Sequence, residues 1–193
     1  SALVKTHCAQ VLLDLTKAFE LLPHDVSIRC GILYGYPLWL LRMSLASYRL
    51  QRFVGVDGVY GNAVRATRGI TAGSGFAVVE LKLLLLRVID SSYARYPLLR
   101  ANNWFWVYVD DITIMWIADD WQSAADVAAK IADWVVWWIN GPCRLQASPK
   151  KSNCVGSNYA MALRIASRVR EAALNAFRSA PMLGSSVGGC RRG

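Results

Sequence analysis

The sequence predicts an α+β fold, in which helices pack on one face of an antiparallel sheet. Residues 104–109 and 112–117 are rich in β-branched and aromatic side chains, which is typical of strands. The pair Asp110-Asp111 between them is typical of a hairpin turn. A short apolar run at residues 9–15 is typical of a buried strand. Segments with helical spacing separate these strands, and this mixture indicates the α+β class.

The composition is that of a packed chain with a basic surface. The chain has 193 residues, of which 54% are apolar, so it fits one domain with a sizeable core and is not expected to be disordered. The formal net charge of +9 favours a polyanionic partner, most often nucleic acid. No run approaches the roughly 18 uncharged apolar residues of a membrane span, and the N-terminus does not resemble a signal peptide. Five scattered cysteines argue against a zinc site and a disulfide scaffold. We therefore expect no membrane contact and an intracellular setting, in the nucleus or the cytoplasm.

The first half of the chain is predicted to contain a strand, a turn, two helices and a β-hairpin, at residues 9–15, 16–20, 23–34, 38–50 and 51–67. Gly35 ends the first helix and Pro37 can start the second, because proline fits the first turn of a helix. Asp57-Gly58 is a strong signal for the turn of the hairpin, with strands near 52–56 and 63–67.

The second half is predicted to contain a glycine loop, a helix, the acidic hairpin, a long helix, a short strand and a helical segment, at residues 68–75, 76–93, 104–117, 121–139, 143–147 and 158–177. Asp120 can cap the long helix, and Gly141-Pro142 can end it. The last dozen residues are rich in glycine and serine and are expected to fray.

Two acidic strand ends form the candidate site. Asp14 lies at the end of one predicted strand and Asp110 at the hairpin turn, so the two are neighbours if the strands pair. Converging carboxylates in a basic protein are a hard-oxygen site for Mg²⁺, and such a site suits two-metal phosphoryl transfer on nucleic acid. Lys150 or Lys151, in the basic turn at 148–152, could neutralise a pyrophosphate leaving group. The alternative is an ordinary Asp-Asp turn, because aspartate favours turns.

Four stretches follow one another in the chain: residues 12–20 (LLDLTKAFE), 68–74 (RGITAGS), 108–111 (YVDD) and 148–152 (SPKKS). In this order they resemble the palm motifs of reverse transcriptases of the non-LTR retrotransposon type. The resemblance covers about residues 10–152, and the hairpin at 51–67 resembles the basic hairpin of that family. It implies a polymerase palm with an antiparallel sheet, partial fingers and no clear thumb, and RNA-directed DNA polymerase activity.

The resemblance assigns roles to the matched positions. Asp14, Asp110 and Asp111 would bind two Mg²⁺ ions, with Mn²⁺ as a possible substitute, for nucleotidyl transfer to a primer 3′-hydroxyl. Lys151 is the better match for the catalytic lysine of the fourth motif, with a solvated turn lysine as the alternative. The implied partners are an RNA template, a DNA primer and deoxynucleoside triphosphates.

Further roles concern the nucleotide and the phosphates. Phe19 falls where the family has the ring that excludes a ribose 2′-hydroxyl, and the alternative is a core aromatic. Gly73 would let the backbone approach the template or the incoming nucleotide, and Tyr108 would lie at the nucleotide. Four arginines would contact phosphates or are solvated surface charges: Arg49, Arg52, Arg65 and Arg68.

The chain also departs from the family pattern. Glu20 replaces the usual Asp, Gly75-Phe76 replace the usual Pro-Leu, and Thr71-Ala72 replace the usual Pro-Gln, so the amide expected near the template base is missing. Only thirteen residues precede Asp14, so a fragment is expected. We expect a reverse-transcriptase palm with partial fingers, a C-terminal helical segment and a disordered tail, at residues 1–156, 157–180 and 181–193. Two alternatives to a polymerase stay open, an inactive retroelement remnant and an unrelated basic α+β module that binds nucleic acid.

Overall fold

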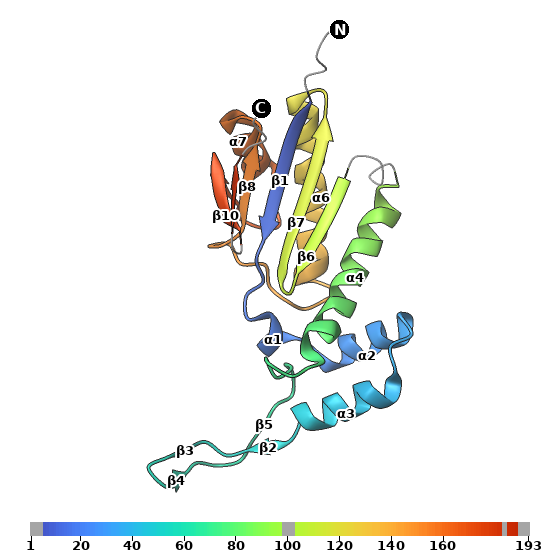
Figure 1. The fold of residues 1–193 in the computed structure, drawn as a ribbon, viewed down its shortest axis with the longest axis vertical. Coiled ribbons are helices and arrows are strands. Elements are labelled where there is room, and N and C mark those ends of the chain that lie inside the picture. The colour runs from blue at the N-terminus through green and yellow to red at the C-terminus, as the bar shows by residue number, and fades with distance from the viewer. Residues whose placement is uncertain (1–5, 98–102, 183–184, 189–193) are drawn as a thin grey trace.

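A five-stranded sheet forms the centre of the computed structural model, which describes residues 6–97, 103–182 and 185–188 (Figure 1). The strand order is β6-β7-β1-β8-β9, and all neighbours are antiparallel except the parallel pair β8 and β9. The strands are β1 (His7–Leu13), β6 (Asn103–Tyr108), β7 (Asp111–Ala118), β8 (Asn153–Gly156) and β9 (Asn175–Phe177). The predicted α+β class with a mainly antiparallel sheet is confirmed.

The core lies between one face of this sheet and three helices, which are α4 (Ala77–Arg95), α6 (Trp121–Asn140) and α7 (Tyr159–Arg168). Successive side chains of a strand point to opposite faces, and the alternate residues Ala9, Val11 and Leu13 of β1 are almost fully buried. Helix α6 contacts β1 and β7, and α7 contacts β8 and β9. Asp120 accepts a hydrogen bond from the Ser123 N–H, so the predicted cap of α6 is confirmed. None of the described helices is long and apolar enough to cross a membrane.

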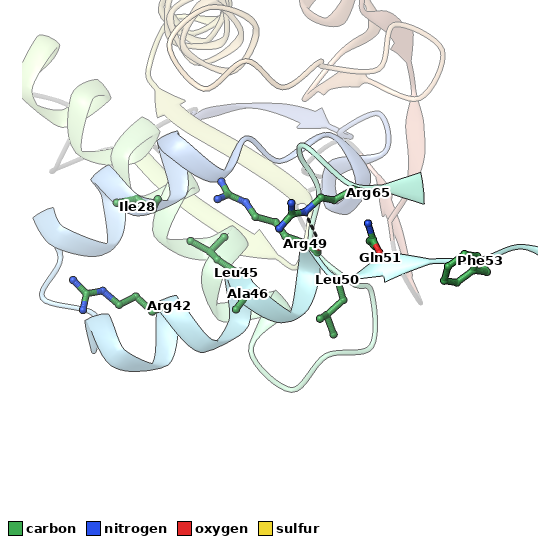
Figure 2. A pocket seen from close by; sticks show the side chains of 9 residues that line it. All are labelled: Ile28, Arg42, Leu45, Ala46, Arg49, Leu50, Gln51, Phe53 and Arg65. Carbon is green, nitrogen blue, oxygen red and sulfur yellow. Dashed lines mark hydrogen bonds between the residues drawn. The ribbon is translucent and has the colours of Figure 1, made fainter. Parts of the chain in front are cut away.

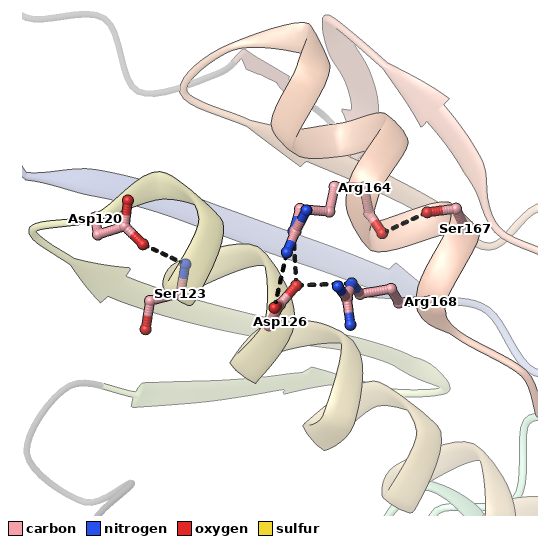
Figure 3. A network of polar contacts seen from close by, with 6 residues as sticks. All are labelled: Asp120, Ser123, Asp126, Arg164, Ser167 and Arg168. Carbon is pink, nitrogen blue, oxygen red and sulfur yellow. Dashed lines mark hydrogen bonds and ion pairs between the residues drawn. The ribbon is translucent and has the colours of Figure 1, made fainter.

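Ion pairs fix α7 on α6 (Figure 3). The Asp126 carboxylate of α6 accepts from Arg164 Nε at 2.7 Å and from Arg164 Nη2 at 3.0 Å. Arg168, one turn further along α7, lies with its Nε 2.8 Å from the same carboxylate. A bidentate arginine contact is geometrically specific, so this network orients α7 together with the packing of its buried residues Met161, Ala162 and Ile165.

Three short helices and a hairpin arm lie below the sheet in Figure 1. The helices are α1 (Ala18–Leu21), α2 (His24–Leu33) and α3 (Leu38–Tyr48). The arm follows α3 and consists of β2 (Gln51–Arg52), β3 (Gly55–Val56), β4 (Val59–Tyr60) and β5 (Val64–Arg65). Asp57 and Gly58 both have positive φ, 51° and 80°, as a tight hairpin turn requires. The turn is therefore confirmed, but the two strands expected near 52–56 and 63–67 are broken into two-residue pairs.

Three expectations for the C-terminal third are wrong. Residues 143–147 form no strand beyond a bridge from Ala147 to Leu15, because Cys143 and Leu145 donate their N–H groups back to the end of α6. The helical segment expected over 158–177 ends at Arg168 and is followed by β9. The Asp133 carboxylate stops this helix by accepting the N–H groups of residues 170 and 171.

The third difference concerns the tail. Where a disordered tail was expected from residue 181, β10 (Ser179–Met182) pairs with β11 (Ser185–Gly188). The remaining residues of the predicted tail, 183–184 and 189–193, lie outside the described part of the chain.

Candidate active site

The pairing of β1 with β7 brings the predicted acids to one end of the sheet. Leu13 of β1 is opposite Ile112 of β7, so the next position of each strand places Asp14 opposite Asp111. On the other side of β7, Asp111 pairs with Tyr108, and only Val109 and Asp110 form the loop of the hairpin. The three aspartates are half-buried. The structure therefore places the three aspartates at the same end of the sheet.

The hairpin loop carries an unusual backbone conformation. Val109 has φ of 57°, and the positive φ is confined to this first loop residue. This is the pattern of a type II′ turn, which ordinarily has glycine at that position. A β-branched residue with positive φ is strained, and strain of this kind persists only where the surroundings impose it.

Negative charge accumulates at this end of the sheet. Burial raises the pKa of the Asp111 carboxyl, and the neighbouring carboxylates of Asp110 and Asp14 raise this pKa further. Lys151 opposes this effect and lowers the same pKa. Like charges are thus close enough to repel one another, and a cation is the group that would relieve the repulsion.

Lys151 is the cation that the chain itself supplies. Its Nζ lies 3.6 Å from Oδ1 of Asp14, while its side chain stays largely exposed. The turn that carries it is fixed to the end of β1, because the Ser148 N–H donates to the Asp14 carbonyl oxygen at 2.8 Å. The Asp14 N–H donates in turn to Oγ of the buried Ser152, at 3.3 Å. Lys151, and not Lys150, is therefore the lysine of this site.

Oxygen donors of this kind suit Mg²⁺ or Mn²⁺. The described residues nevertheless contain no group of three or more His, Cys, Asp or Glu side chains arranged to hold a metal ion. The three aspartates gather without forming a closed ligand cluster, and Lys151 neutralises one of them. Their chemistry fits a divalent cation, and their assignment as its ligands belongs to the proposal below.

The glycine loop docks onto α1, next to the site. The Ile70 N–H donates to the Phe19 carbonyl oxygen, and the Gly69 N–H donates to that of Leu22, both at 2.7 Å. Gly69 has φ of 88°, and a Cβ atom there would lie 2.5 Å from the carbonyl oxygen of Glu20. Only glycine fits this contact. The Phe19 side chain is half-buried and packs against the core, so the contacts of a core aromatic are present.

Gly73 differs from Gly69 in its surroundings. It has φ of 89°, but a Cβ atom would meet nothing within 4 Å. Its surroundings are therefore open, and its predicted contact with template or nucleotide stays a prediction. Tyr108 is also open, with 58% of its surface exposed beside the hairpin loop.

The four predicted arginines are exposed, and three of them are held by the protein. Arg49 Nε donates to His24 Nδ1 at 3.0 Å, and Arg65 Nε donates to the Arg49 carbonyl oxygen at 3.1 Å. Arg52 reaches Oγ1 of Thr71 at 3.2 Å. Arg68 lines a pocket of about 410 Å³ that also includes Arg49 and Arg144.

Sequence reasoning missed the buried residues that support the glycine loop. His24 accepts from Arg49, so its Nε2 carries the proton and donates to the Gly69 carbonyl oxygen at 2.6 Å. The Tyr48 hydroxyl lies 3.0 Å from Oε2 of the fully buried Glu80 and 3.2 Å from Oγ of Ser74. Glu80 interrupts an apolar helical run, which was the available signal.

Comparisons with known proteins support the fold. No protein-family model matches the chain, and no curated protein matches it. The structure is similar to that of apo telomerase from Candida tropicalis truncated from its C-terminal domain, with a TM-score of 0.60 and 9% sequence identity. The match covers 78% of this chain and 31% of the telomerase chain. At this identity the likeness shows a shared polymerase-like α+β fold, and the chain spans less than a third of the telomerase it resembles.

Proposed function

We propose that this chain is the palm, with part of the fingers, of a template-directed nucleotidyltransferase. The observation that carries the proposal is the placement of Asp14 opposite Asp111, with Lys151 3.6 Å from Asp14. The fold similarity to telomerase, a reverse transcriptase, supports it. The finer assignment, an RNA-directed DNA polymerase of the non-LTR type, is supported by the four motifs.

Asp14, Asp110 and Asp111 would hold two Mg²⁺ ions, which activate the primer 3′-hydroxyl and bind the triphosphate when present. Lys151 would leave Asp14 and neutralise the pyrophosphate leaving group, because its exposed side chain is free to turn toward a ligand. The open backbone at Gly73 and the exposed Tyr108 ring would contact the nucleotide. RNA template and DNA primer would lie between the end of the sheet that carries the three aspartates and the arginines of α3 and the arm.

Metal binding tests the carboxylate site directly. Mn²⁺ binding, followed by electron paramagnetic resonance, should weaken about tenfold or more in Asp110→Asn, because a charged oxygen ligand is lost. Asp119→Asn removes the same charge from an exposed position after β7 and should bind Mn²⁺ like the wild type. Equal Mn²⁺ binding by Asp110→Asn and the wild type would contradict the two-metal assignment.

Primer extension tests the reaction. We expect the 193 residues by themselves to be inactive or nearly so, because positioning of the triphosphate by complete fingers supplies much of the rate. Asp110→Ala should abolish whatever incorporation the wild type shows. Phe19→Ala should keep incorporation and admit ribonucleotides if the ring excludes the 2′-hydroxyl. Unchanged sugar selectivity in Phe19→Ala would leave Phe19 as a core aromatic alone.

A second candidate is an inactive remnant that still binds nucleic acid. Ala72 in place of the amide expected by the resemblance favours it. Primer–template binding without Mn²⁺ binding and without extension would select this candidate.

A further inference from the structure

A basic groove lies between α3 and the base of the hairpin arm (Figure 2). It is separate from the end of the sheet that carries Asp14, Asp110 and Asp111. Its volume is about 1020 Å³, and its lining includes three arginines, Arg42, Arg49 and Arg65. The rest of the lining is apolar except for Gln51, and no acidic residue contributes to it among the described residues. The groove therefore complements an anion that also carries apolar surface.

Two of the arginines are fixed in a way that leaves them available to a ligand. Arg49 and Arg65 each use Nε for a hydrogen bond to the protein, Arg49 to His24 and Arg65 to the Arg49 carbonyl oxygen. A bond through Nε restrains the guanidinium plane and leaves the terminal N–H groups free to bind phosphate bidentately. In the described part of the chain no carboxylate pairs with Arg42, Arg49 or Arg65.

Two of the arginines that line the groove come from the same stretch of chain. Arg42 is on α3, and Arg49 directly follows Tyr48, the last residue of that helix. Seven helical residues rise by about 10 Å, so the two Cα positions are about two turns apart. Arginines placed in a row can contact neighbouring phosphates of one strand, as a polynucleotide ligand requires.

Exposed apolar side chains at the same groove distinguish a single strand from a duplex. Phe53 is 61% exposed and Leu50 is 64% exposed. The bases of a duplex are stacked and paired inside it, whereas those of a single strand are free to stack on an aromatic ring. An arginine-lined groove with an exposed aromatic ring is the combination that single-strand binding uses.

We propose that this groove binds single-stranded nucleic acid, with phosphates on Arg42, Arg49 and Arg65 and a base on Phe53. The inference rests on the proposed function only in taking nucleic acid as the ligand, and it requires neither metal nor catalysis. Arg42 and Phe53 lie outside the catalytic residues and are exposed, so replacing them should leave the fold intact.

Fluorescence anisotropy with a labelled single strand of about ten nucleotides, without metal or nucleotide, tests the groove. Arg42→Gln should reduce the slope of log affinity against log salt by about 0.7, because one phosphate contact is lost. Phe53→Ser should weaken binding about fivefold or more with an unchanged slope, because one stacked base is lost. The matched control Lys130→Gln removes one charge from α6 and should change neither quantity.

Wild-type affinity and slope in both Arg42→Gln and Phe53→Ser would overturn the proposal, as would an equal loss in Lys130→Gln. A blunt duplex that binds more tightly and shows the same two losses would also overturn it, in favour of a duplex. A wild-type dimer that Phe53→Ser dissociates would assign the groove to a second copy of the chain. Asp110→Asn should bind the single strand like the wild type, so failure at the carboxylates and failure at the groove are separate results.

Discussion

At the scale of single residues, the strained backbone of Val109, in the hairpin loop of the candidate site, should lower the stability of the protein. Val109→Gly should raise the free energy of unfolding by about 1 kcal/mol, because glycine adopts positive φ without a Cβ clash. Urea denaturation measures this difference. Val107→Gly, in β6, should lower the same free energy by roughly 1 kcal/mol or more. The substitution removes the packing of the valine side chain, and it raises the conformational entropy of the unfolded chain. A Val109→Gly variant less stable than the wild type would show that the backbone there is not strained.

At the scale of elements, the docking of the glycine loop on α1 depends on a close backbone approach. Gly69→Ala should destabilise the protein by about 2 kcal/mol or more, because it adds a contact with the Glu20 carbonyl oxygen to the cost of positive φ. Gly73→Ala should cost about 1 kcal/mol, since it has positive φ but open space. Gly75→Ala should leave the stability unchanged or raise it slightly, because Gly75 has open space and no positive φ. Thermal unfolding of the three variants gives this order, and equal losses at Gly69 and Gly73 would contradict the close approach.

The contact between α6 and α7 should depend on pH. Hydrogen bonding and ion pairing with Arg164 hold the pKa of the Asp126 carboxyl below its ordinary value of 3.8, as the charge of Arg168 also does. A lowered folded-state pKa means that the ion pair stabilises the fold above the unfolded pKa and is lost as pH falls through the folded pKa. Asp126→Asn should therefore lower the thermal midpoint at neutral pH, and its difference from the wild type should shrink as the pH falls below 3.8. A difference that is constant with pH would mean that packing alone holds α7.

At the scale of the whole molecule, the charge of +9 predicts strongly salt-dependent binding of a primer–template, which has a duplex part and a single-stranded part. If Arg49, Arg52, Arg65 and Arg68 each contact one phosphate, the slope of log affinity against log salt should be about −3.6. Affinity should then fall roughly 150-fold between about 50 and 200 mM salt. Anisotropy across this range measures the slope, and binding that is indifferent to salt would exclude the phosphate contacts.

The sequence determined the features that depend on neighbours in the chain. The hairpin around Asp110, the cap at Asp120 and the turn at Asp57 follow from residues a few positions apart, and the structure confirms each of them. The α+β class followed from the same local patterns. The predicted strand at 143–147 failed because its apolar residues hydrogen-bond to the end of α6, and local pattern does not show this distant contact.

Only the tertiary structure decided which distant residues meet. Asp14 and Asp111 lie opposite each other because β1 and β7 pair in one register, and a shift by one residue would place them on different faces. The tertiary structure also placed Lys151, rather than Lys150, next to Asp14. The hydrogen bonds of Ser148 and Ser152 with the Asp14 backbone fix the turn in this position. The end of α7 was decided in the same way, by a carboxylate from α6. The physical reason is that strand register, ion pairs and capping across elements are set by packing, which no local stretch of sequence contains.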